Sequence, residues 1–263
     1  MSKSETQTAP DVAVIFPTYC EAENIGGLIQ TIEDLNLNSI LLVIDDSSPD
    51  ETQNIVEKLK EKYKNIILLN RPQKMGLGTA IIDGFRLLLS QPNPPKYIIT
   101  MDADYSHNPK DIPRILDRAK NGYDLVVGSR YCEGGIVKGW TVIRRITSVV
   151  ANRIAGSLVK LLINDFTSGF RCYSKRCVQK VLPKLHSQTY EIQIETIRQA
   201  KLQNLKVVET PITFENRKKG KSKLTLTEIV AFSKYIIKVM LEQNKTRAMS
   251  NQGYLAEIGS NYA

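Results

Sequence analysis

The sequence predicts an α/β protein: a mainly parallel, Rossmann-like sheet flanked by helices, with C-terminal amphipathic helices. Two observations predict this fold class. Short apolar runs alternate with longer segments of helical periodicity, and most of the runs are too apolar to leave one face in water. Buried strands that alternate with helices are typical of βαβ units and a parallel sheet. The 263 residues, 42% of them apolar, suffice for one large domain or two small ones.

Most of the expected strands and helices lie in the first half of the chain. The expected strands are Val12–Phe16, Ile40–Ile44, Ile66–Leu69, Tyr97–Met101, Leu125–Val127 and, further along, Val207–Glu209. The expected helices between them are Glu23–Glu33, Glu51–Tyr63, Leu77–Ser90 and Asp111–Lys120. One helix start carries a capping pattern, with Ser48 at the N-cap, Pro49 at the first helical position and Glu51 at the third.

The second half of the chain has a different character. Thr141–Leu162 and Leu224–Gln243 are expected to be long amphipathic helices, with the polar turn Asn164–Phe170 and the helix Tyr190–Gln203 between them. No run reaches ~18 uninterrupted apolar residues, and the N-terminus lacks the apolar run of a signal peptide, so neither a transmembrane helix nor a signal peptide is expected. We expect a flexible N-terminus over residues 1–11, a single domain over residues 12–243 and a mobile C-terminal tail over residues 244–263.

The net charge of +9 indicates an anionic partner: nucleic acid, an anionic membrane surface or a phosphorylated ligand. Nucleic acid is disfavoured, because the chain has no RNP-type aromatic motif, zinc pattern or evident helix-turn-helix. Basic residues gather over Arg130–Arg145 and over Arg217–Lys223, and each group leads into a long amphipathic helix, as in an interfacial element beside anionic lipid. The four cysteines form no CxxC pair, so we expect small core residues in a reducing cytoplasm.

Acidic residues follow three of the expected strands, where an open parallel sheet binds its ligands. Glu21 follows the first strand, Asp45 and Asp46 follow the second, and Asp102 and Asp104 follow the fourth. The spacing of Asp102 and Asp104 lets both carboxylates face one point, and their hard oxygens suit Mg²⁺ or Mn²⁺. Because these carboxylates would repel one another, we expect a cation among them. A dinucleotide site is excluded, since no G-x-G-x-x-G follows the first strand.

Together these motifs resemble the dolichyl- or polyprenyl-phosphate mannosyltransferases of glycosyltransferase family 2, which have the GT-A fold. The resemblance runs from about Val12 to about Lys238. The motifs shared across family 2 are Pro17-Thr18-Tyr19-Cys20-Glu21, Ile44-Asp45-Asp46-Ser47-Ser48, Gly76-Leu77-Gly78 and Met101-Asp102-Ala103-Asp104. Those more specific to the polyprenyl-phosphate branch are Gly128-Ser129-Arg130-Tyr131, Gly134-Gly135, Trp140, Arg144-Arg145, Ser148, Ala151-Asn152, Asp165-Phe166-Thr167-Ser168-Gly169-Phe170-Arg171 and Gly220-Lys221-Ser222-Lys223.

The resemblance implies a role for each matching residue. Donor contacts are implied for Pro17, Tyr19, Glu21, Asp46, Ala103, Arg217 and Lys223, of which the last two close over the donor phosphates. Metal binding is implied for Asp102, Asp104 and, in the place where many members have glutamine, Ser106 acting through water. Grip on the acceptor phosphate is implied for Arg130, Arg144 and Ser148. Asp102, Asp104 and Arg130 are the expected catalytic residues, and the helix with Gln193 and Glu195 is expected under the sugar.

The resemblance implies an inverting enzyme that moves mannose from GDP-mannose to a dolichyl or polyprenyl phosphate and gives a β-mannosyl phosphate lipid, with Mg²⁺ or Mn²⁺ as cofactor. The alternatives are glucose transfer from UDP-glucose to the same lipid, another family 2 glycosyltransferase, and a homologue that keeps the fold without catalysis. We expect a peripheral protein on the cytoplasmic face of a membrane, which reaches its acceptor by its own helices or with a small membrane-anchoring subunit, and no nucleic-acid partner.

Overall fold

The computed structural model describes residues 10–217 and 230–242. The chain divides into two compact units, Met1–Lys223 and Leu224–Ala263. In the second unit the described residues form one helix, 230–242, which lies within the expected Leu224–Gln243. Nearly all of the expected N-terminal segment and the whole tail after residue 243 lie outside the described residues, and the single domain over 12–243 stays a prediction.

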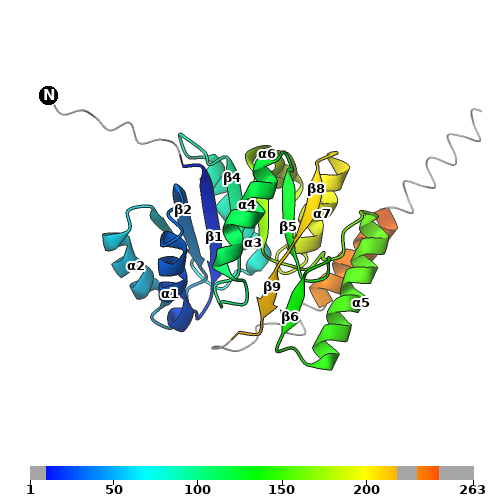
Figure 1. Cartoon of the computed structure of the whole chain (residues 1–263), viewed down its shortest axis with the longest axis horizontal. Coiled ribbons are helices and arrows are strands. Elements are labelled where there is room, and N and C mark those ends of the chain that lie inside the picture. Colours follow the sequence, from blue (N-terminus) through cyan, green and yellow to red (C-terminus); the bar gives the residue numbers. More distant parts are fainter. Residues whose placement is uncertain (1–9, 218–229, 243–263) are drawn as a thin grey trace, which may run out of the picture. The chain divides into compact units, whose positions relative to one another are not determined.

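The first unit is built on a seven-stranded sheet in the order β3-β2-β1-β4-β7-β5-β8. Its strands are β1 (Val12–Thr18), β2 (Ser39–Asp45), β3 (Ile66–Asn70), β4 (Tyr97–Thr100), β5 (Leu125–Ser129), β7 (Arg171–Ser174) and β8 (Val207–Pro211). Neighbouring strands are parallel, except that β7 runs antiparallel to β4 and β5. The mainly parallel sheet is therefore confirmed (Figure 1).

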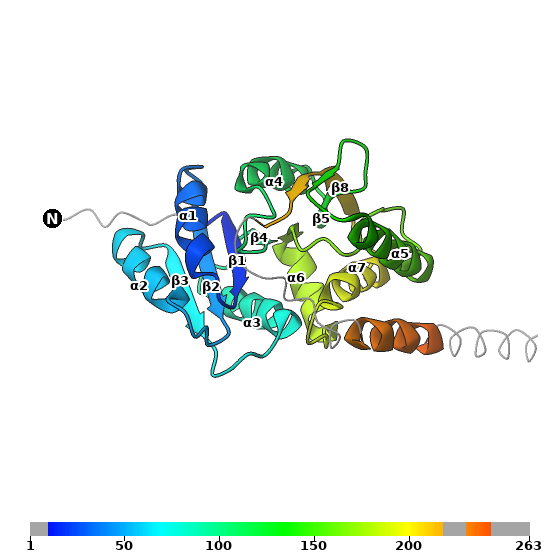
Figure 2. The ribbon, with the colours of Figure 1, turned by 90° about the horizontal axis from the view of Figure 1, so that it is seen from below.

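Helices cover both faces of this sheet (Figure 2). They are α1 (Ala22–Glu33), α2 (Thr52–Lys62), α3 (Leu77–Leu89), α4 (Ile112–Lys120), α5 (Val142–Val159), α6 (Lys175–Val181) and α7 (Ile192–Leu202), with short 3₁₀ turns at Pro109–Asp111 and Leu182–Lys184. Alternate residues of β1 point to opposite faces: Val12, Val14 and Phe16 belong to the core beneath α1 and α4, while Ile15 approaches α3 on the other side. This two-sided burial explains the uniformly apolar strands.

The structure adds elements that the apolar pattern did not predict. Strand β7 is short and polar in sequence, and a second, two-stranded parallel sheet joins β6 (Ile136–Lys138) to β9 (Thr213–Glu215). Helix α6 was also not predicted. These strands hold too few residues for a recognisable alternation, and their partners lie far away in the sequence. They bring the later motifs of the chain to the edge of the sheet that carries Asp102 and Asp104.

One local prediction is wrong. Ser48 does not cap α2, because the helix begins at Thr52 and its N-cap, Glu51, makes no side-chain cap. Ser48 Oγ instead donates to Asp45 Oδ1 at 2.6 Å and accepts the backbone N–H of Cys20 at 2.9 Å. Asp50 accepts the backbone N–H of Thr52 at 3.1 Å, so the turn is held by a different side chain. The competing tertiary bond to Asp45 decided the outcome.

Candidate active site

The ends of β2, β1 and β4 lie side by side, because these three strands are neighbours and parallel. Their acidic residues therefore reach one edge of the sheet, as the sequence predicts. Two of these carboxylates are held by the protein itself: Asp46 pairs with a buried arginine, and Asp45 accepts hydrogen bonds from uncharged neighbours. Buried Asp45 accepts hydrogen bonds from Thr18 Oγ1 at 2.8 Å, from Gln53 Nε2 at 2.8 Å and from Ser48.

Asp46 is held by a buried arginine. Arg71 Nε donates to Asp46 Oδ1 at 2.6 Å, and its Nη2 forms an ion pair with the same oxygen. The other oxygen, Oδ2, accepts the backbone N–H groups of Met75 at 3.0 Å and Gly76 at 3.1 Å. Four N–H groups thus surround one carboxylate, and they fix the loop between β3 and α3. Sequence reasoning missed Arg71, since nothing local distinguishes a buried arginine from an exposed one.

This loop also carries Lys74, whose Nζ lies 4.6 Å from the centre of the Tyr19 ring. The following glycines permit a close backbone approach. A Cβ at Gly76 would lie 2.5 Å from the Gln188 carbonyl oxygen, and one at Gly78 would lie 2.4 Å from that of Ser187. The Gly76-Leu77-Gly78 motif therefore packs α3 against the segment before α7, and Gly76, with φ at 97°, needs glycine on both counts.

Two glutamates hold that segment. Glu195 accepts the backbone N–H groups of His186 at 3.0 Å and Ser187 at 2.9 Å. Glu191 accepts those of Gln188 at 2.9 Å and Thr189 at 3.0 Å. Glu195, expected in a helix under the sugar, is therefore directed to the loop 186–189 and shapes the site through it.

Asp102 and Asp104 stand in contrasting environments. Burial raises the pKa of Asp102, and the negative charges of Asp104 and Glu21 raise it further. Burial would also raise the pKa of Asp104, but hydrogen bonds from Ser106 and the positive charge of Arg217 outweigh it and lower that pKa. Arg217 Nη2 lies 3.0 Å from Asp104 Oδ2, so the structure brings these two predicted site residues together.

His107 supports this loop and was not assigned a role from the sequence. Its Nδ1 accepts the backbone N–H of Asp102 at 3.2 Å, and its ring stacks on Phe170 and meets Phe214 edge-on. Burial lowers the pKa of His107, which is therefore neutral and carries its proton on Nε2. Ser106 is buried in the same turn, and its backbone N–H donates to Asp104 Oδ1 at 3.0 Å.

Space and unpaired polar groups beside Asp102 fit a bound cation. A Cβ at Gly169 would lie 3.2 Å from Asp102 Oδ1 and 3.5 Å from Gln193 Nε2, so a larger residue there would crowd the Asp102 carboxylate. Gln193 Oε1 is buried without a hydrogen-bond partner in the described part of the chain. No three His, Cys, Asp or Glu side chains meet as a ligand set within residues 10–217 and 230–242. A pair of carboxylates suits Mg²⁺ or Mn²⁺ that keeps water and substrate phosphate oxygens as further ligands.

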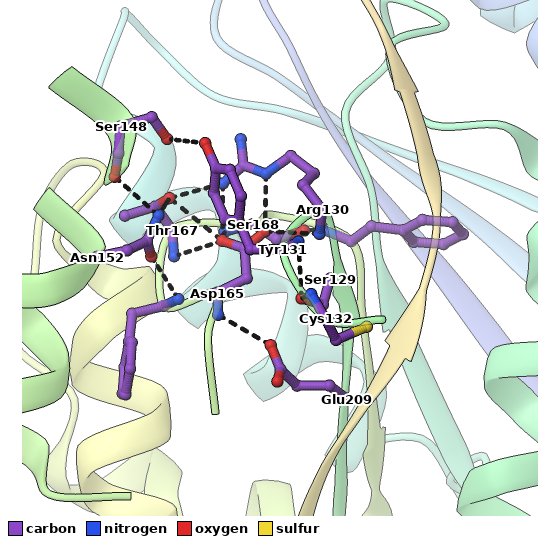
Figure 3. A network of polar contacts seen from close by, with 12 residues as sticks. Ser129, Arg130, Tyr131, Cys132, Ser148, Asn152, Asp165, Thr167, Ser168 and Glu209 are labelled. Atoms are coloured by element: carbon purple, nitrogen blue, oxygen red, sulfur yellow. Dashed lines mark hydrogen bonds and ion pairs between the residues drawn. The ribbon is translucent and has the colours of Figure 1, made fainter. Parts of the chain in front are cut away.

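Arg130 faces Asp165 in a buried, two-pronged ion pair (Figure 3). Its Nε donates to Asp165 Oδ2 at 2.7 Å and its Nη2 to Oδ1 at 2.8 Å, with Thr167 Oγ1 as a third acceptor. Burial opposes both charges, yet each partner stabilises the other, so the pKa of Arg130 is raised and that of Asp165 is lowered. Asp165 also accepts the backbone N–H groups of Arg130 and Ser168.

Helix α5 is bonded to this ion pair (Figure 3). Asn152 donates to Thr167 Oγ1 at 3.2 Å and accepts the backbone N–H of Phe166 at 2.6 Å. One turn earlier, Ser148 Oγ accepts the Tyr131 hydroxyl at 2.8 Å. The predicted acceptor residues Arg130 and Ser148 are therefore linked through neighbouring side chains, although they come from different elements.

Arg144, the third predicted acceptor residue, lies on the first turn of α5 over Trp140. Its Cζ is 4.4 Å from the ring centre, and its Nη1 donates to Asn216 Oδ1 at 3.0 Å. Partial burial and the positive charges of Arg217 and Arg130 lower the pKa of Arg144. Three arginines thus share one region next to Asp102 and Asp104.

The remaining residues predicted to contact the donor lie near the ends of β1 and β4, except for Lys223. Pro17 and Tyr19 lie at the end of β1, and Glu21 is buried at the start of α1, where it accepts Asn24 Nδ2 at 2.9 Å. Ala103 is buried between the two aspartates. Lys223 lies outside the described residues.

The sheet, the carboxylate pair at its edge and the arginines opposite define the class of this protein as a glycosyltransferase with the GT-A fold. The chain belongs to the family described as Glycosyl transferase family 2, which it matches over residues 13–182. A polyprenol monophosphomannose synthase from Mycolicibacterium smegmatis is 35% identical over 218 residues, 82% of this chain and 82% of the relative. A dolichol-phosphate mannosyltransferase from Pyrococcus furiosus is 35% identical over 87% of this chain, which spans 63% of that relative.

Solved structures share the fold. A glucosyl-3-phosphoglycerate synthase from Mycobacterium tuberculosis, in complex with Mn²⁺, UDP and glucosyl-3-phosphoglycerate, superposes with a TM-score of 0.64 at 18% identity, covering 89% of this chain and 79% of that one. A mannosyltransferase from Pyrobaculum calidifontis, in complex with GDP-Man and Mn²⁺, has a TM-score of 0.57 at 13% identity, covering 91% and 66%. At these identities the likeness shows the fold alone.

Proposed function

We propose that this protein transfers mannose from GDP-mannose to a polyprenyl or dolichyl phosphate, with inversion, to give a β-mannosyl phosphate lipid. The names of both relatives support this reaction class. The observation that carries the proposal is the grouping of Arg130, Arg144 and Arg217 opposite the Asp102–Asp104 pair. Arginines suit a phosphate acceptor, because a guanidinium group is permanently charged and offers several N–H donors to phosphate oxygens.

The chemistry needs no general base. A phosphate monoester is already ionised near neutral pH, so one of its oxygens attacks the anomeric carbon directly, while the bond from that carbon to the GDP oxygen breaks and GDP leaves with the electron pair. Arg130 and Arg144 hold the incoming phosphate and offset its repulsion from the donor diphosphate. Arg217, which pairs with Asp104, would bind the diphosphate, and Asp102 and Asp104 would hold Mg²⁺ or Mn²⁺, which would neutralise the charge developing on the leaving group.

The donor nucleoside is proposed to lie near Pro17, Tyr19, Glu21 and Ala103. Because four protein N–H groups already surround the Asp46 carboxylate, we propose that Asp46 shapes the nucleoside site through the loop it holds. Lys223 is proposed to assist Arg217, and Ser106 to reach the ion through water.

The membrane is proposed to meet α5. Apolar side chains on this helix are unusually exposed: Val142 by 74%, Ile143 by 79%, Ile146 by 57%, Val150 by 47% and Ile154 by 40%. Four of them recur at every fourth position and form one stripe. No helix of the described residues is long and apolar enough to cross a bilayer. Insertion of this stripe among anionic lipids would place Arg144 and Ser148 of the same helix close to a lipid phosphate.

Positive charge favours the cytoplasmic leaflet, which is rich in anionic lipids, so we propose peripheral binding there. A small membrane-anchoring subunit is the alternative route to the acceptor. Direct binding of the purified chain to vesicles supports the first route, whereas binding that requires a co-expressed membrane protein supports the second.

A transfer assay with purified protein tests the proposed reaction. GDP-mannose and UDP-glucose are each offered with a short isoprenyl phosphate, with Mg²⁺, Mn²⁺ or a chelator. The proposal expects mannosyl phosphate lipid from GDP-mannose only with a divalent ion. Glucosyl transfer from UDP-glucose in place of mannosyl transfer contradicts the assigned donor, and transfer to a free alcohol but not to the phosphate contradicts the assigned acceptor.

A further inference from the structure

We propose that Trp140 is a positioning residue of the acceptor site: its indole ring holds the guanidinium groups of Arg130 and Arg144 in the arrangement that receives the acceptor phosphate. This inference rests on the proposed function and adds a residue for which the sequence implied no role. Trp140 lies between β6 and α5. It is therefore part neither of the ion pair of Arg130 with Asp165 nor of the helix that carries Arg144.

The geometry places one ring in contact with both charges. Arg130 Cζ lies 5.3 Å from the centre of the Trp140 ring and Arg144 Cζ lies 4.4 Å from it. Both distances fall within the ~6 Å range of cation–π attraction, and tryptophan is the strongest ring for this contact. Arg130 also lies 5.4 Å from the centre of the Phe214 ring.

Arg130 is held more firmly than Arg144, so the Trp140 ring matters more for the position of Arg144. Arg130 is fixed by the buried carboxylate of Asp165. Arg144 forms no salt bridge within the described residues, and its one side-chain hydrogen bond there goes to the uncharged Asn216. The pKa of Arg144 is lowered by its partial burial and by repulsion from its neighbours Arg217 and Arg130. The ring therefore adds to the attraction of the Asp104 carboxylate and keeps Arg144 beside Arg130.

The ring itself is fixed. Trp140 meets Phe214 of β9 edge-on, with ring centres 5.3 Å apart and an interplanar angle of 72°. Phe214 in turn packs against His107, which supports the Asp102 loop. The Trp140 indole Nε1 is buried without a hydrogen-bond partner in the described part of the chain, so packing rather than hydrogen bonding sets its position. Aromatic contacts thus connect the loop that carries Asp102 with Arg130 and Arg144.

Two substitutions separate positioning from a purely structural role. Trp140→Phe keeps an aromatic face, whereas Trp140→Leu keeps apolar volume only. With a short isoprenyl phosphate as acceptor, Trp140→Leu should raise the acceptor KM about tenfold and leave the GDP-mannose KM within about twofold, while Trp140→Phe stays within about threefold of the wild type for both, because a phenyl ring retains much of the cation–π attraction. Equal increases in both KM values, or an unchanged acceptor KM in Trp140→Leu, would overturn the inference.

Fluorescence gives a readout that does not depend on turnover or on folding of the leucine variant. Trp140 is the only tryptophan, so the indole emission of the wild-type protein reports this position alone. Titration with the isoprenyl phosphate should change the emission with a midpoint that matches its KM, and Arg144→Gln should shift the midpoint to higher concentration. Emission that stays constant at saturating acceptor would contradict the inference. If the wild type transfers no mannose yet its emission responds to the isoprenyl phosphate, the proposed reaction fails and the phosphate-site inference stands.

Discussion

The pKa values of Asp102 and Asp104, two positions apart in sequence, shift in opposite directions because the neighbours of the two carboxylates differ. Asp104 receives hydrogen bonds from Ser106 and an ion pair from Arg217, and its pKa is lowered although burial opposes this. Burial raises the pKa of Asp102, the negative charges of Asp104 and Glu21 add to this, and the nearby positive charge of Arg217 does not outweigh them. We therefore expect a divalent ion to stabilise the ionised form of Asp102 more than that of Asp104.

Asp102→Asn should reduce mannosyl transfer by at least about 100-fold, because it removes a charge proposed to hold the ion beside the leaving diphosphate. Mn²⁺ binding followed by electron paramagnetic resonance should weaken in parallel. Asp117→Asn, which changes an exposed carboxylate on α4, is the matched control and should leave both measurements unaltered. Near-normal transfer by Asp102→Asn would remove Asp102 from the metal site.

The charge of Asp165 should matter for the stability of the fold, because it pairs with the buried Arg130. In Asp165→Asn the buried guanidinium of Arg130 loses its counter-charge, which should cost about 3–5 kcal/mol in the free energy of unfolding measured with urea. Thr167→Ser keeps the hydroxyl that Arg130 contacts and serves as the conservative control. An Asn variant as stable as the wild type would show that the ion pair contributes little.

The same pair predicts a pH dependence. The folded pKa of Asp165 is lowered, so its contribution to stability is complete above the ordinary aspartate pKa of about 3.9 and is lost as the pH falls through the lowered folded value. Acid unfolding curves of the wild type and Asp165→Asn should therefore converge towards low pH. A gap that widens on acidification would contradict the direction of this pKa shift.

At the scale of elements, the connection from β3 to α3 depends on Arg71. This side chain is buried and bonds to Asp46, to Thr79 Oγ1 at 2.7 Å and to the Gly76 carbonyl at 3.0 Å. It joins the end of β3 to the first turn of α3 and to the loop that carries Lys74.

Arg71→Met should lower the free energy of unfolding by about 3 kcal/mol or more, since Asp46 is left buried without its counter-charge. GDP binding measured by calorimetry should weaken as well, because the loop beside Tyr19 is released. Arg86→Met is a close control: Arg86 pairs with Asp83 on the same helix but is 65% exposed, so its loss should cost only about 0–1 kcal/mol. Equal effects of the two substitutions would refute the role of Arg71.

Helix α5 combines two functions on different faces. Asn152 and Ser148 bond to Thr167 and Tyr131, while the stripe with Val142 and Ile146 is exposed. The helix thus connects an apolar surface to the residues proposed to grip the acceptor.

Ile146→Glu should reduce binding to vesicles of anionic phospholipid by roughly tenfold in a sedimentation assay, since a charge replaces an apolar group that would enter the lipid. Leu202→Glu is the matched control, because Leu202 and Ile146 are both 57% exposed but Leu202 ends α7. Similar losses for both variants would mean that α5 is not the contacting surface.

At the scale of the whole molecule, a net charge of +9 accompanies a chain in which no described helix spans a membrane. Attraction to an anionic surface is screened by salt with a Debye length of about 8 Å at physiological ionic strength. Vesicle binding by the wild type should therefore fall steeply between low salt and about 0.5 M salt, and should be weak on uncharged vesicles at any salt concentration. Binding that is insensitive to both salt and lipid charge would contradict this.

The sequence was sufficient for what depends on local patterns. Apolar runs predicted six strands of the main sheet within a few residues, because burial on both faces of the central strands favours a continuous apolar run. The position of Asp102 and Asp104 followed from the rule that parallel strands end at one edge. Strand β7, helix α6 and the β6–β9 pair were not predictable in this way, because such short segments acquire their structure from distant partners.

What the sequence alone determined is the family, the fold and the types of group at the site. What only the tertiary structure decided is which charges face one another. Asp46 meets Arg71, Asp104 meets Arg217, and Arg130 meets Asp165 across 35 residues of chain, whereas Asp45 accepts hydrogen bonds from uncharged side chains. Ion pairing depends on distances of a few ångströms between atoms that are remote in sequence, and those distances exist only after the sheet has brought its loops together.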